Sequence, residues 1–199
     1  MLFRSYAEGS TSSEGQIHAT IDGGEGHDVV NVHGGWNDHL SLTGVEQVNA
    51  GNTWTGLTIT ADAALSSATL GEGSDTLTVT AVGDSVTTTV NAGDGNDTVT
   101  FNASAGADVH ATVYGGYGDD TVSITASAED AQGNYRNEGN ITASVAGGEG
   151  NDTVNLSVVY ADGSTSGEGQ IHATIDGGEG HDVVNVHGGW NDHLSLTGV

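Results

Sequence analysis

A short glycine-acid motif that returns along the chain is the feature that most constrains its fold. Six segments carry it: GGEGHD at 23–28, LGEGSD at 70–75, AGDGND at 92–97, GGYGDD at 115–120, GGEGND at 147–152 and GGEGHD at 177–182. From Asp75 onward the closing aspartates follow one another at intervals of 22 to 32 residues. Internal repeats with periods of about 20–50 residues are typical of solenoids, in which each repeat packs only on its neighbours.

A second, longer repeat encloses the first. Tyr6–Val45 and Tyr160–Val199 differ at two of 40 positions, and the offset is 154 residues. A seventh turn, VNAGNTWTG at 48–56, has the same flanks but no acid, so the interval from Asp28 to Asp75 is interpreted as two coils. We therefore expect a non-repeat start at 1–5, one six-coil period at 6–159 and the beginning of the next period at 160–199. The chain is interpreted as an excerpt from a longer tandem array.

Apolar residues alternate with polar ones on both sides of each turn. Ile141, Ala143 and Val145 precede one turn, and Val154 and Leu156 follow it. Period-two alternation indicates strands with one buried face, and no segment has helical spacing. The sequence predicts an all-β fold, a parallel β-solenoid resembling a β-roll, with about seven to eight coils and two short strands in each.

The charge of the chain indicates which partners it can have. Against 27 Asp and Glu there are only 2 Lys and Arg, so the formal net charge is -25. Such a chain repels itself unless cations neutralise it, and it is a poor partner for nucleic acid. No apolar run reaches the roughly 18 residues of a membrane helix, so we expect no membrane insertion. The absence of Cys excludes disulfides and thiolate metal sites.

The glycine-acid turns contain the groups that could bind cations and so neutralise these charges. Glycines allow positive φ, so backbone carbonyls can point inward beside the aspartate carboxylate, and calcium prefers six to eight such oxygens. Stacked coils then form one row of Ca²⁺ sites, interrupted at the acid-free turn near Asn52. The predicted ligands are the second and fourth turn glycines, the closing aspartates and two further aspartates: Gly24, Gly26, Asp28, Asp38, Gly71, Gly73, Asp75, Gly93, Gly95, Asp97, Gly116, Gly118, Asp120, Gly148, Gly150, Asp152, Gly178, Gly180, Asp182 and Asp192.

Three of these segments resemble a known family. GGEGHDVVN (23–31), GGYGDDTVS (115–123) and GGEGNDTVN (147–155) are similar to the G-G-x-G-x-D-x-U-x nonapeptide of RTX, or haemolysin-type, calcium-binding repeats. The resemblance implies a right-handed parallel β-roll, calcium between neighbouring turns, and an extracellular or cell-surface location in large bacterial adhesins or fibres. RTX repeats follow one another directly and form two rows of ions. Here only 23–42 has a near-tandem second turn.

Other residues allow further interpretations. The six-residue spacing of His27, His33 and His39 does not place them on one face, so we expect surface positions rather than a zinc or copper site. Outward threonine rows indicate a solvated β-face, and in some solenoids such rows bind ice. Sequons at Asn102 and Asn140 could carry glycans. The polar loops at 127–140 and 160–169, together with Trp36, Trp54, Trp190 and Tyr135, could contact sugars.

No catalytic motif accompanies the turns. HExxH, GxSxG and Walker sequences are absent, and the paired carboxylates recur in every coil, whereas an active site is unique. We expect no enzyme activity. The sequence favours a calcium-stabilised structural unit of an extracellular filament or adhesin stalk, which stacks head to tail on copies of itself. The alternatives are a calcium-dependent carbohydrate- or surface-binding module and the calcium-folding tail of an exported protein.

Overall fold

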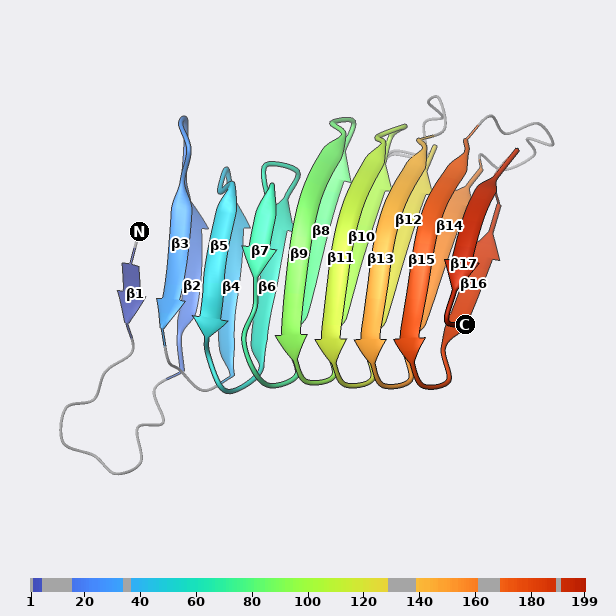
Figure 1. The fold of residues 1–199 in the computed structure, drawn as a ribbon. Helices are drawn as coiled ribbons and strands as arrows, with labels where there is room; N and C mark the ends of the chain where they lie inside the picture. Colours follow the sequence, from blue (N-terminus) through green and yellow to red (C-terminus); the bar gives the residue numbers. More distant parts are fainter. Residues whose placement is uncertain (1, 5–15, 34–36, 129–138, 161–168, 189–190) are drawn as a thin grey trace.

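The fold is a stack of β-strands in two parallel sheets, one behind the other (Figure 1). The computed structural model describes residues 2–4, 16–33, 37–128, 139–160, 169–188 and 191–199. Within them the chain alternates between the sheets at every strand, so two strands make one coil. The predicted all-β parallel solenoid is confirmed. The seventeen strands of these ranges make between eight and nine coils, against seven to eight expected.

The nine-stranded sheet holds the odd-numbered strands: β1 (Leu2–Arg4), β3 (Val29–His33), β5 (Gln47–Asn52), β7 (Ser67–Thr69), β9 (Val86–Asp94), β11 (Val109–Tyr117), β13 (Ile141–Glu149), β15 (Ile171–Glu179) and β17 (His193–Thr197). The eight-stranded sheet holds the even-numbered strands: β2 (His18–Asp22), β4 (Asp38–Thr43), β6 (Leu57–Asp62), β8 (Thr76–Val82), β10 (Thr98–Ser104), β12 (Thr121–Ser127), β14 (Thr153–Val159) and β16 (Val183–His187). None of the described residues forms a helix long and apolar enough to cross a membrane.

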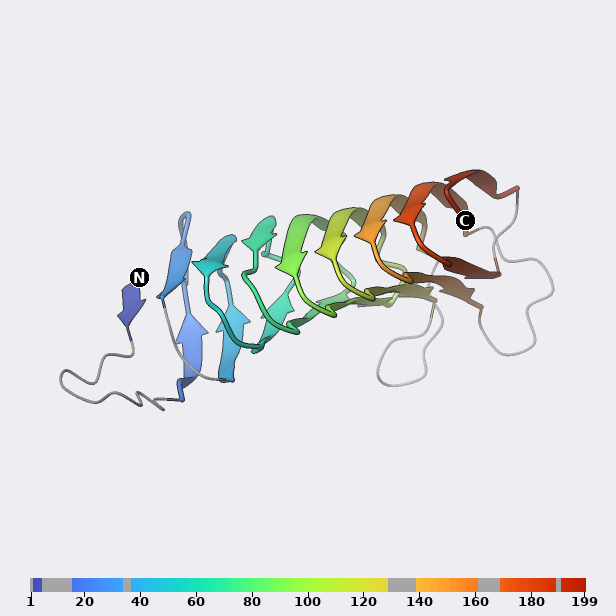
Figure 2. The ribbon, with the colours of Figure 1, turned by 60° about the horizontal axis from the view of Figure 1, so that its bottom comes forward.

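The core is a thin layer of side chains between the two sheets. Figure 2 shows these sheets as two separate layers. Each strand buries every second side chain, so equivalent residues stack in columns, such as Val79, Phe101, Ile124 and Leu156. A column of small residues in the nine-stranded sheet includes Ala111, Ala143 and Ala173. Small side chains there allow the sheets to approach closely, and long parallel registers hold the columns in line.

The turns lie at two edges of the solenoid. We call the edge where the nine-stranded sheet leads into the eight-stranded sheet the aspartate edge, and it runs along the bottom of Figure 1. The turns after β7, β9, β11, β13 and β15 lie there, and each ends on a motif aspartate. At the opposite edge, the chain returns from the eight-stranded sheet to the nine-stranded sheet.

Equivalent strands of the two copies of the 40-residue repeat lie in opposite sheets, which corrects the predicted six-coil period. β2 belongs to the eight-stranded sheet, but β15, which contains the equivalent residues, belongs to the nine-stranded sheet. In the described ranges, equivalent strands are thirteen strands apart, or six and a half coils. The prediction counted two coils from Asp28 to Asp75. It missed that the ten residues from Asp28 to Asp38 contain a whole strand, β3, and so add half a coil.

Candidate cation-binding site

Five aspartates stack in register along the aspartate edge and form a hydrogen-bonded series, which we call the aspartate ladder. Each backbone N–H donates to Oδ1 of the aspartate in the next coil, and the ladder comprises Asp75, Asp97, Asp120, Asp152 and Asp182. The four N···Oδ1 distances are 2.7 to 2.8 Å. At its N-terminal end, Leu57 N–H donates to Asp75 Oδ1 at 2.6 Å. The predicted stacking of turn aspartates is present along this edge.

Glycines bring the turns of successive coils close enough for this series. Gly148 has φ +119°, and a Cβ on it would collide with the carbonyl oxygen of Gly116 in the preceding coil. A Cβ on Gly147 would collide with both Asp152 Oδ2 and the Gly177 carbonyl oxygen. Each turn is therefore glycine-rich for two reasons, the positive φ and the close approach of backbone or carboxylate oxygens.

One carboxylate oxygen of each later ladder member has no partner. Oδ2 of Asp97, Asp120, Asp152 and Asp182 is buried and accepts no hydrogen bond from any described residue. Asp75 differs, because its Oδ2 accepts from Gly71 N–H at 3.2 Å. A buried carboxylate oxygen that has neither a hydrogen-bond donor nor a counter-charge is costly, because nothing compensates for the hydration that it loses on burial. The ladder therefore needs a proton or a cation on its inner oxygens.

Burial alters the acidity of these groups. The side chain of Asp97 is 2% exposed. Its burial, together with the neighbouring carboxylates, raises the pKa of Asp97 to about 7. Burial likewise raises the pKa of Asp75 and of Asp120 to about 6, and raises that of Asp152. Backbone hydrogen bonds act in the opposite sense but do not overcome desolvation. The ionised ladder is thus unfavourable when no cation accompanies it.

A second series lies on the solvent side of the ladder, one residue earlier in each turn. Asp119 N–H donates to Asn96 Oδ1 at 3.0 Å, Asn151 N–H donates to Asp119 Oδ1 at 2.7 Å, and His181 N–H donates to Asn151 Oδ1 at 3.1 Å. These side chains are exposed and vary in type. The exposed series also links a backbone N–H to a side-chain Oδ1 of a neighbouring coil, but the donation runs from the later coil to the earlier one, and the acceptors are not uniformly carboxylates.

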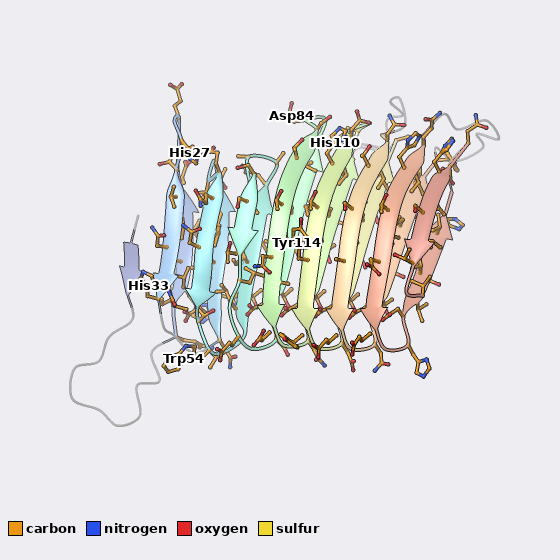
Figure 3. All side chains as sticks on the ribbon, viewed as in Figure 1. His27, His33, Trp54, Asp84, His110 and Tyr114 are labelled. Atoms are coloured by element: carbon orange, nitrogen blue, oxygen red, sulfur yellow. The ribbon has the colours of Figure 1, made fainter. Side chains whose placement is uncertain are left out.

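The predicted single row does not include every aspartate assigned to it. Asp28 lies at the opposite edge, as Figure 3 shows for its neighbour His27, and its N–H donates to Glu46 Oε2 at 2.6 Å. Asp192 also lies at that edge, while its counterpart Asp38 lies on the aspartate edge; each accepts the N–H of an isoleucine, Ile171 and Ile17 respectively. The half-coil offset between the repeats separates them.

The stacked turn aspartates are interrupted at the acid-free turn, where the sequence predicted a gap in the row. Leu57 takes the place of an aspartate between Asp38 and Asp75. In the turn before it, the Thr53 hydroxyl donates to the Ala50 carbonyl oxygen at 2.8 Å. Trp54 projects from this turn and is 78% exposed, at the bottom of Figure 3. The acid-free turn is therefore built by a local hydroxyl contact instead of a carboxylate.

The donor set of the ladder is chemically suited to a hard cation. Above Gly115, Gly147 and Gly177, the unpaired Oδ2 of the turn's own aspartate approaches the same point as a carbonyl oxygen of the following coil. Carboxylate and carbonyl oxygens are the ligands that Ca²⁺ takes. In the part of the chain that the structure describes, no three His, Asp or Glu side chains gather around one point. Backbone oxygens would therefore supply most of the ligands.

The sequence did not reveal one group of side chains, the histidine pairs, and some residues that it singled out lie outside the described ranges. The rings of His18 and His39 stack across adjacent strands, and those of His172 and His193 lie side by side with an interplanar angle of 40°. The two histidines of each pair are 21 residues apart, so the sequence does not indicate that they are neighbours unless the length of the coil is already known. The loop residues 129–138 and 161–168, with Trp36 and Trp190, were proposed to contact sugars and lie outside the described residues.

The fold and the ladder together define a class of protein: a parallel β-solenoid whose coils are joined at one edge by stacked, buried carboxylates. Comparison with family models, with characterised proteins and with solved structures finds no match to this chain.

Proposed function

We propose that this chain is a structural, calcium-stabilised solenoid unit of an extracellular filament or adhesin stalk. The observation that carries the proposal is the aspartate ladder with its buried, unpaired Oδ2 atoms. Ca²⁺ between neighbouring turns would be bound by these oxygens and by turn carbonyls, and would supply the positive charge that the edge lacks. The resemblance of the turns to RTX repeats supports the same ion.

The choice of aspartate over asparagine supports a cation rather than a simple turn. Asn96 and Asn151 in the exposed series accept the same kind of N–H bond through an amide oxygen. An asparagine in the ladder would make the identical contact without a charge. Nevertheless, all five ladder positions hold aspartate. The second, negatively charged oxygen is thus the feature that distinguishes the ladder, and a cation gives it a role.

The electrostatic cost of the bare ladder is large. Neighbouring strands lie about 4.8 Å apart. At an effective dielectric constant of about 20, two unit charges at that separation repel by roughly 3.5 kcal/mol. Four adjacent pairs repel in this way along the ladder, so cation binding and folding should be coupled.

The burial of one repeat copy inside the solenoid is consistent with stacking of one copy on the next. Leu40 and Val45 in the first copy are 2% and 1% exposed. Leu40 pairs with Ile59 of the following strand β6. The corresponding Leu194 and Val199 of the second copy are 41% and 56% exposed. A further coil with the sequence that follows Val45 would cover the second copy in the same manner. Unpaired strands at the end of a sheet also favour addition of another strand.

Electron microscopy of the native material, with and without EDTA, tests the proposal. Stacked periods should form fibres with an axial translation of about 31 Å per 154 residues, because six and a half coils rise about 4.8 Å each. Calcium should stabilise the chain against thermal unfolding in the same preparation. A compact particle that neither assembles nor responds to the chelator would contradict the proposal.

One observation favours a second candidate, contact with carbohydrate. Trp54 is largely exposed on the acid-free turn, and exposed aromatic rings commonly stack on sugars. A glycan array with the wild type and Trp54→Ala, both in calcium, separates the candidates. Loss of a specific glycan signal with unchanged thermal stability would support binding, and equal signals would remove this candidate.

A further inference from the structure

A shallow trough crosses the outer face of the nine-stranded sheet. It is an open hollow of about 830 Å³, and its lining comes from β9, β11, β13, β15 and β17 together with Asp192. Because these five strands are neighbours in the sheet, the trough runs along the solenoid axis. It is therefore separate from the aspartate ladder, which lies at one edge of the sheet.

The packing of the core explains why the sheet is hollowed here. The trough lies over Ala111, Ala143 and Ala173, the column of small residues that face the core. The buried residues on either side of this column are larger, such as Ile141 and Val145 on β13. Small side chains let this part of the sheet lie closer to the other sheet, so its outer surface is concave.

Hydroxyl and imidazole groups line the trough. Thr112, Ser144 and Thr174 are in register on neighbouring strands and form the middle of its floor, which Thr89 and Ser195 extend. The residues that precede the floor by two positions form a second column: Thr87, His110, Thr142, His172 and His193. Among the described residues that line the trough, Asp192 is the only acid. The trough is thus nearly uncharged, although the chain has a net charge of -25.

A neutral, linear, hydroxyl-rich polymer matches these properties. Hydroxyl and imidazole groups both donate and accept hydrogen bonds. Neighbouring strands lie about 4.8 Å apart, so the five strands offer a row of similar groups about 19 Å long. An extended β-1,4-linked polysaccharide advances by a similar distance with each sugar and presents hydroxyls at every step. An anionic polymer would instead be repelled by the acidic chain.

An aromatic ring stands beside the floor. Tyr114 follows Thr112 by two residues on β11, so its side chain leaves the same face of the sheet, and it is 51% exposed. Figure 3 labels Tyr114 and His110 on this strand. Exposed aromatic rings pack on the apolar faces of sugars. Tyr117, at the end of the same strand on the aspartate edge, is 58% exposed but does not flank the trough.

We propose that the trough binds a neutral, β-1,4-linked polysaccharide chain, which lies along the solenoid axis across the five strands. This adds a ligand-binding role to the structural function. It uses neither the aspartate ladder nor Trp54, which projects from the acid-free turn.

Calorimetric titration of the full chain, in saturating calcium, tests the inference with the β-1,4-linked hexasaccharides of glucose, mannose and N-acetylglucosamine. The wild type should bind at least one of them, and more tightly than maltohexaose, whose α-1,4 linkages make the chain coil. Thr112→Leu removes a hydroxyl and fills the floor, so it should weaken binding about tenfold. Tyr114→Ala should weaken binding as well. Thr100→Leu, on the outer face of the eight-stranded sheet, and Tyr117→Ala are the matched controls and should keep the wild-type affinity.

Two results would overturn the proposal. The first is that the wild type binds none of the three hexasaccharides at millimolar concentration. The second is that Thr112→Leu binds as tightly as Thr100→Leu, including the case in which Trp54→Ala alone loses the ligand. Thermal unfolding of the same samples with and without calcium separates this question from the structural function. A chain that calcium stabilises but that binds no sugar would refute the trough alone.

Discussion

Replacing Asp120 by asparagine should have opposite effects with and without calcium. The asparagine oxygen can still accept the Asp97 N–H, now bonded to Oδ1 at 2.8 Å. The change removes the buried charge and replaces the unpaired Oδ2 by an amide that can donate to a neighbouring oxygen. In chelator the substitution should therefore stabilise the fold, whereas in calcium it should remove a ligand.

The magnitude in chelator follows from the acidity of the group. Burial raises the pKa of Asp120 from 3.8 to about 6. At about 1.36 kcal/mol per pKa unit, ionising it in the folded chain costs up to about 3 kcal/mol at pH 7.5. Asp120→Asn should raise the free energy of unfolding in EDTA by up to that amount. Asp119→Asn, the adjacent exposed position with the same change of charge, should alter it by less than about 0.5 kcal/mol.

Urea unfolding at pH 7.5, in EDTA and in millimolar calcium, measures both effects. The stabilisation that calcium gives should be smaller in Asp120→Asn than in the wild type and in Asp119→Asn, since ligand binding stabilises only the state that binds. If Asp120→Asn lowers stability in EDTA, the carboxylate stabilises the fold unaided, and the argument for a cation at the ladder is refuted.

Three further outcomes follow from the same structure. In EDTA the wild type should become more stable as pH falls from 7 to 5, by about 2.3 kcal/mol from Asp97 alone, because its raised pKa makes the folded state bind the extra proton. A rise in stability with pH in chelator would contradict this. Gly148→Ala should destabilise by several times the cost of Gly24→Ala, because both have positive φ but only Gly148 meets a neighbouring backbone; equal thermal shifts would exclude the steric part. Phe101→Ala, at a fully buried position, should cost about 3–5 kcal/mol in urea unfolding, and a cost below 1 kcal/mol would mean that the core is not packed as described.

The strands and their stacking could be predicted because one periodicity encodes both. Alternation such as Ile141, Ala143 and Val145 specifies which side chains face inward, and in a parallel stack the equivalent residues of successive coils must then align. Ile141 pairs with Ile171 and Val145 with Ile175. The turn glycines added the boundaries between strands. The fold class and the stacking of successive turn aspartates from Asp75 to Asp182 followed from these two signals.

The edge on which each turn lies could not be predicted from the same signals. A glycine-aspartate turn can join the sheets at either edge, so the motif at 23–28 looks the same as that at 177–182. Only the number of strands between the two motifs distinguishes the edges. The strand β3 has five residues, and nothing in the sequence marks so short a segment as half a coil of its own. The partners of the carboxylate oxygens and the histidine pairs depend on that count as well.

The odd number of strands in the repeat gives a tandem array an unexpected symmetry. Because each period ends half a revolution from where it began, consecutive copies would be related by a two-fold screw along the fibre axis, and 308 residues would restore the starting orientation. Every surface feature of the repeat would then recur on both flanks. A fibre built in this way has no distinct front and back, and could bind neighbours on either side at once.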